Sequence, residues 1–130
     1  MASKNKITLS NLPSLDENQL LPYLDRTEII MQTVEQIKKD FDFHELQIQL
    51  HDYNQNVYQK LSEQIEPFVL KLIENNYQQL LQLLYRIDVS EKAISKSTAD
   101  SNAISLSSEI TKLIILRELQ KVVIRNYYKS

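Results

Sequence analysis

Apolar residues recur every three or four positions along most of the chain, which is the spacing of amphipathic helices. The first such stripe contains Ile30, Val34, Ile37 and Phe41. Asp25 precedes it, and Glu28 follows three residues later, which is the arrangement of a capping box. The pattern predicts a helix that begins after Asp25 and ends near Asp40.

A second stripe occupies the middle of the chain. It contains Val57, Leu61, Ile65, Phe68, Val69, Ile73, Tyr77, Leu80, Leu84 and Ile87. Pro67 has no amide hydrogen and crowds the preceding turn, so we expect the helix to stop or kink there. The stripe keeps its phase through Asn75 and Asn76, which predicts that this pair is exposed helix surface.

Polar residues then separate the middle of the chain from its end. Asp88 and Glu91 form another capping pair, which predicts a short helix to about Lys96. The stretch from 95 to 102 reads Ser-Lys-Ser-Thr-Ala-Asp-Ser-Asn, a composition typical of a loop. We expect the final helix to begin between 105 and 108, capped by Ser107 and Ser108, and to reach about Tyr128.

On a helical wheel, the apolar residues of the final helix cover more than half of its circumference. A helix with an apolar arc wider than half its circumference usually lies at the centre of a fold or is shared with a partner. Gln120 falls inside this arc and, if buried, needs a hydrogen-bond partner, which the same residue of a second subunit could supply. The predicted interface comprises Leu113, Leu116, Leu119, Gln120, Val123 and Tyr127.

The segment near residues 45–50 is ambiguous. Leu46, Ile48 and Leu50 alternate with polar residues, as in a half-buried strand, whereas Leu46, Leu50, Tyr53 and Val57 fit one helical face. We favour a short extended segment at 45–50.

The fold class predicted by these patterns is all-α: an antiparallel bundle of three to four long helices. The 130 residues suffice for one domain, which we place at residues 23–130. Residues 1–22 are polar, contain Pro13 and Pro22, and have no sustained period. They predict a flexible N-terminal arm with Leu20, Leu21 and Leu24 docked on the core.

The absence of two residue types limits the chemistry. Without Gly, positive backbone φ angles must fall on Asn or Asp, and the glycine-rich loops that bind nucleotides and dinucleotides are excluded. Without Cys there is no disulfide, thiolate metal site or Cys nucleophile. We therefore expect no cofactor.

Charge and hydropathy indicate no membrane segment. The formal net charge is -2, so no overall field attracts nucleic acid or anionic lipid. Residues 1–12 have no apolar signal-peptide core, and no apolar run approaches the ~18 residues of a membrane span. We expect a cytoplasmic protein.

Candidate catalytic and metal-binding residues are few. His44 and His51 are seven positions apart, too far for one ion on a helix and on opposite faces of a strand, so we expect surface histidines and no metal. No serine has a recognisable base and oxyanion hole. These observations favour a non-enzymatic protein.

One charge pattern has a functional character. Arg117, Lys121, Arg125 and Lys129 recur every four residues along the last helix, and Tyr127 and Tyr128 lie beside them. They are candidate phosphate contacts. The alternative is that these cations interact with the helix dipole and keep the outer face solvated.

Three functions are consistent with the sequence. The first hypothesis is a small protein–protein interaction protein, adaptor or regulatory, that self-associates through its last helix. The second is a nucleic-acid accessory protein that uses the basic stripe, and the third is a ligand binder or enzyme with a site between helices.

Overall fold

The computed structural model describes residues 17–41, 48–50, 55–98 and 102–129, with only the backbone described at 91, 96–98 and 129. All regular elements in these ranges are helical, so the all-α prediction is confirmed. They are α2 (Glu17–Leu20), the 3₁₀ helix η1 (Leu21–Asp25), α3 (Thr27–Asp40), α4 (Val57–Asn75), α5 (Tyr77–Ile87), α6 (Glu91–Thr98) and α7 (Ala103–Lys129). Four of them are long, from 11 residues in α5 to 27 in α7.

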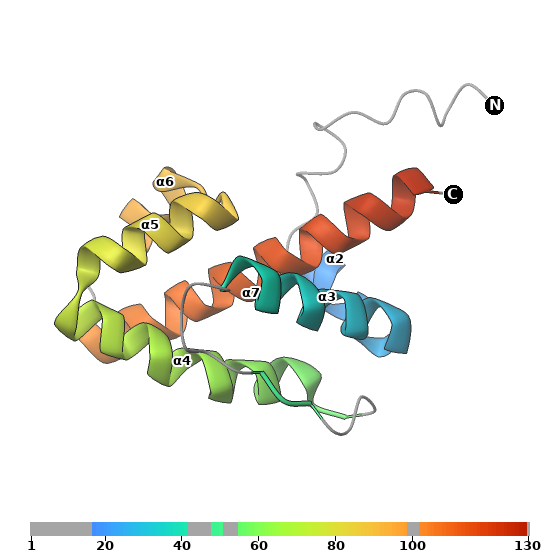
Figure 1. Ribbon diagram of the computed structural model, residues 1–130, viewed down its shortest axis with the longest axis horizontal. Coiled ribbons are helices and arrows are strands. Elements are labelled where there is room, and N and C mark those ends of the chain that lie inside the picture. Colours follow the sequence, from blue (N-terminus) through green and yellow to red (C-terminus); the bar gives the residue numbers. More distant parts are fainter. Residues whose placement is uncertain (1–16, 42–47, 51–54, 99–101, 130) are drawn as a thin grey trace.

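Helix α7 is the centre of the fold. It packs against α2, α3, α4, α5 and α6, and it runs the length of the molecule, with α3 and α4 in the opposite direction (Figure 1). Its fully buried apolar residues are Ile110, Ile114, Ile115, Leu119 and Val122. The broad apolar arc of this helix is therefore explained largely by contacts within one chain.

The N-terminal end of the described chain is packed against this core. Leu20 in α2 and Leu24 in η1 are buried, and Leu21 is half-buried. Residues 17–22, which lie within the predicted arm, are thus helical, whereas residues 1–16 lie outside the described residues. The predicted capping box is wrong: Asp25 ends η1, and α3 begins at Thr27 after Arg26, which makes no side-chain cap.

Two expectations for the middle of the chain are corrected, the first of them in part. Of the stop or kink expected at Pro67, the stop is wrong, because helix α4 continues through Pro67 to Asn75. The break lies at Asn76, whose φ of -158° leaves the helical region. Its side-chain oxygen accepts a hydrogen bond from the backbone N–H of Gln79 at 3.2 Å. Asn76 is therefore the N-cap of α5 and not helix surface, and the chain reverses between α4 and α5 (Figure 1).

The caps after α5 also differ from the expected ones. Asp88 closes α5 with a left-handed φ of 72°, and Ser90 accepts from the Ala93 amide at the start of α6. Asn102 accepts from the Ser105 amide and caps α7, whereas Ser107 is buried inside that helix. In the described chain the positive φ angles fall on Asn56 and Asp88, as expected without glycine.

The described part of the ambiguous segment, Ile48–Leu50, is neither helix nor strand. Ile48 is buried, and the backbone of Gln49 is held by the side-chain amide of Gln64 in α4. That amide accepts from the Gln49 N–H at 2.8 Å and donates to the Gln49 carbonyl at 2.7 Å. A side chain thus takes the place of a neighbouring strand. Residues 45–47 lie outside the described residues.

We predict that Ile114→Ala lowers the free energy of unfolding by about 2–5 kcal/mol, because it leaves a cavity at the centre of the core. Ile104→Ala, on the same helix but 68% exposed, should change it by less than about 0.5 kcal/mol. Urea denaturation measures both. Equal effects would contradict the central position of α7.

Candidate functional site

The basic stripe of α7 is engaged by other helices. Arg117 donates to Asp88 at 3.1 Å and to Gln120 at 2.8 Å. Lys121 lies 3.0 Å from Asp40. These two candidate phosphate contacts therefore already have carboxylate partners, and the last one, Lys129, has no described side chain.

Arg125 is less engaged than the other two described cations of the stripe. Its guanidinium donates to the neutral oxygen of Gln36 in α3 at 3.1 Å. Its side chain is exposed, and it has no carboxylate partner among the described residues. The predicted stripe is thus split between two engaged cations and one that remains accessible.

A buried pair of carboxyl groups lies beneath the stripe. Glu118 in α7 is 0% exposed, and Asp40 at the end of α3 is also buried. The Lys121 ammonium lies 3.0 Å from Asp40 Oδ2 and 3.3 Å from Glu118 Oε1. Among the described residues, no donor is in hydrogen-bonding geometry with either oxygen of Glu118, whereas Asp40 accepts from both Lys121 and Gln36.

The two carboxyl groups are shifted in opposite directions. Burial, reinforced by the neighbouring Asp40, raises the pKa of Glu118 to about 9. Burial also acts to raise the pKa of Asp40, but hydrogen bonds from its neighbours outweigh it, so that pKa lies below its ordinary value. At neutral pH the pair therefore holds one proton, on Glu118, with Asp40 as the neighbouring acceptor.

This cluster joins two helices. It ties the C-terminal end of α3 to the middle of α7. Asp40 and Glu118 are not among the residues that line the three grooves described below. Buried ionic groups fix the relative position of helices in some proteins, and we infer the same role for this cluster.

The largest of the three grooves lies between α2, the turn from α5 to α6, and α7. Its volume is about 580 Å³. Its lining is mostly apolar and comprises Glu17, Leu20, Asp88, Val89, Ser90, Ala93, Leu113, Leu116, Arg117 and Gln120. A groove of this size and composition is suited to an apolar segment.

The predicted interface residues divide between this groove and the core. Leu113, Leu116 and Gln120 line the groove, together with Arg117 from the basic stripe. Leu119 and Val123 are buried inside the chain. Tyr127, 47% exposed, lies near the end of α7 and does not line the groove. A partner would therefore contact only part of the predicted set.

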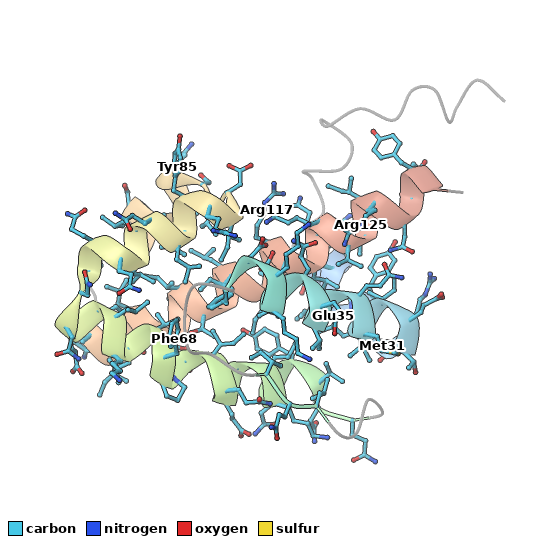
Figure 2. All side chains as sticks on the ribbon, in the orientation of Figure 1. Met31, Glu35, Phe68, Tyr85, Arg117 and Arg125 are labelled. Atoms are coloured by element: carbon cyan, nitrogen blue, oxygen red, sulfur yellow. The ribbon has the colours of Figure 1, made fainter. Side chains whose placement is uncertain are left out.

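Ion pairs flank the groove at two places. Lys112 lies 3.1 Å from Glu17 of α2, and Arg117 lies 3.1 Å from Asp88 at the end of α5. Figure 2 shows Arg117 between α7 and the end of α5. Each pair consists of one positive and one negative group, so the two pairs together contribute no net charge.

Two smaller grooves lie elsewhere. One, of about 470 Å³, lies between α3 and α7 and is lined by Met31, Gln32, Glu35, Gln36, Lys39 and Arg125. The other, of about 330 Å³, lies between α5 and α6 and is lined by Leu81, Tyr85, Val89, Ile94 and Ser95.

The remaining candidates for chemistry add no assembled site. His44 and His51 lie outside the described residues, and among the described ones no group of three potential metal ligands comes together. Ser107 donates its hydroxyl hydrogen to the Ile104 carbonyl at 2.7 Å, and its oxygen lies 3.4 Å from Glu66 Oε2, which places the hydroxyl in the contact between α7 and α4. Within the described ranges, no helix has both the length and the apolar character needed to cross a membrane.

The sequence carries a signal for the burial of Glu118. Glu118 is four residues after Ile114 and four before Val122, which are both fully buried, so it lies on the innermost face of α7. The apolar arc predicted Gln120 as its buried polar residue. That residue is only half-buried and pairs with Arg117.

The chain matches no protein-family model, and no curated protein or solved structure is significantly similar to it. The geometry of its surfaces is therefore the basis for a functional proposal.

We predict that the stability of the protein falls as the pH rises from about 4.5 to about 9. The folded state keeps the Glu118 proton in this window because its pKa is raised to about 9, whereas the unfolded chain releases the proton near 4.5. The free energy of unfolding should fall by up to about 1.4 kcal/mol per pH unit through this one group.

Urea denaturation between pH 5.5 and 8.5 measures this slope. Glu118→Gln should flatten it, because an amide resembles the protonated acid and has no proton to lose. Glu74→Gln, at an exposed position of α4, should leave the slope unchanged. An identical slope in wild type and Glu118→Gln would show that Glu118 is ionised in the folded protein.

Proposed function

We propose that this protein is a small non-enzymatic interaction protein, adaptor or regulatory, that self-associates through the groove between α2, the α5–α6 turn and α7. The supporting observation is the groove itself, which is the largest of the three and presents the half-buried Leu113 and Leu116 beside Gln120. Apolar surface of this kind is stabilised when a partner removes it from water.

The apolar lining of the groove comes from separate elements. Leu20 is contributed by α2, Ala93 by α6 and Leu113 by α7, with Val89 in the connecting turn. Because a packed scaffold holds these side chains in place, the groove is formed before a partner arrives, which lowers the entropic cost of binding.

The charges around the groove favour a second copy of this chain as the occupant. A two-fold dimer juxtaposes identical surfaces, so each charge must find an opposite charge in the same set. The rim offers one cation and one anion at each of its two ion pairs, Lys112–Glu17 and Arg117–Asp88. In the dimer, the cation of either pair in one subunit can approach an anion of the second subunit, and the converse holds for the anions. No net repulsion therefore opposes the contact.

The alternative functions receive less support. A nucleic-acid interface would use the basic stripe of Arg117, Lys121, Arg125 and Lys129. Two of these four cations, Arg117 and Lys121, are engaged by Asp88 and Asp40. A ligand-binding or catalytic site between helices would need convergent polar groups, and the buried pair of Glu118 and Asp40 does not line any of the three grooves. For the compartment we propose the cytoplasm, on the sequence grounds given above.

We predict that sedimentation velocity at high micromolar concentration detects a dimer of the wild-type chain. Leu116→Glu should shift it to monomer, because the substitution places a charge on the apolar wall of the groove. Ile104→Glu, on an exposed position of the same helix outside the groove, should leave the dimer intact.

A second variant separates loss of the dimer from loss of the fold. Ala93→Trp fills the groove from α6 with an apolar side chain, so it should block the dimer while the circular dichroism spectrum keeps its helical form. A wild-type chain that remains monomeric at high micromolar concentration would remove the self-association proposal.

A further inference from the structure

The groove between α3 and α7 differs in character from the apolar one. Figure 2 labels Met31 and Glu35 on α3 and Arg125 on α7. All three residues line this groove. Gln36 contributes to its lining and accepts from Arg125 at 3.1 Å. The neighbouring Gln32, also in the lining, accepts from Asn126 at 2.7 Å. Side-chain amides thus join the two helices here and give the groove a polar lining.

The cations of this groove lack carboxylate partners. Lys39 and Arg125 both line it, both are exposed, and neither pairs with a carboxylate among the described residues. The only acid in the lining, Glu35, lies 3.6 Å from the Lys38 ammonium. The groove therefore presents positive charge on a chain whose formal net charge is -2.

An apolar anchor point lies in the same groove. Met31 is 51% exposed, although it is a large hydrophobic residue on an otherwise amphipathic helix. Flexible methionine side chains adapt to different apolar partners. Two cations, side-chain amides and one exposed methionine together form a surface that complements an acidic peptide with an apolar residue.

We propose that the α3–α7 groove binds an acidic segment of a partner protein, with a carboxylate against Lys39 and Arg125 and an apolar side chain against Met31. Charge complementarity identifies the occupant: opposite charges steer association and select the partner. A nucleic acid is disfavoured because it gains affinity from many phosphate contacts, and the lining of this groove holds two cations, Lys39 and Arg125. The proposal does not depend on self-association, because none of these residues lines the apolar groove.

Fluorescence anisotropy tests this proposal with a short labelled peptide of alternating Glu and Ser with one central Leu. The double variant Lys39→Glu, Arg125→Glu should weaken binding about tenfold, and Lys39→Gln with Arg125→Gln should weaken it less. Glu35→Gln should strengthen binding, because it removes the only acid from the lining. Added salt should weaken binding of the wild type.

The matched control is Lys71→Glu with Lys92→Glu, which lowers the net charge equally. These exposed lysines lie on α4 and α6, away from the groove, so binding should change by less than about twofold. Equal losses in the two double variants would overturn the proposal. So would failure of the wild type to bind the peptide, tight binding of the peptide with Lys in place of Glu, or stronger binding of a single-stranded oligothymidylate.

Discussion

The burial of α7 is the constraint on which the rest of the structure depends. Each of the other described α-helices packs against it, and its fully buried residues repeat along one face from Ile110 to Val122. Helix α7 is the main partner of both α3 and α4, and α5 packs against α4 as well as α7. The surfaces between the helices, including both proposed binding grooves, are therefore positioned by α7.

The ionic cluster of Glu118, Asp40 and Lys121 adds specificity to this packing. An apolar interface tolerates sliding of one helix along another, whereas a carboxyl pair with one proton and one ammonium has few satisfactory arrangements. The cluster therefore fixes where α3 ends along α7. Burial raises the pKa of Glu118 to about 9, so the folded state holds a proton that the unfolded chain releases. The free energy of unfolding therefore falls as the pH rises.

The fold class was predictable because helical periodicity reports burial directly. Ile37, Leu61 and Leu84 are fully buried as their stripes predict, and Phe68, Ile73 and Tyr77 are partly buried. What periodicity cannot show is a change of direction: the stripe is in phase across Asn76, yet the chain reverses there. A break of this kind depends on one pair of backbone angles and one cap, which leave no trace in the apolar pattern.

The candidate site was less predictable for a related reason. A wide apolar arc is equally compatible with a central helix and with a shared one, and only the fold places Leu119 and Val123 inside the chain and Leu113 and Leu116 at a groove. The basic stripe was visible in the sequence. The fold divides this stripe: Arg117 is paired with Asp88, whereas Arg125 remains accessible. This division depends on contacts between residues far apart in the chain.

Hydrogen–deuterium exchange along α7 tests the central claim most directly. If α7 is enclosed by the other helices, amides between Ile110 and Val123 exchange only when the whole domain unfolds and are the slowest in the protein. Amides of the short helix α6 should exchange faster, since it lies at the periphery. Exchange of the 110–123 amides as fast as those of α6 would contradict the account.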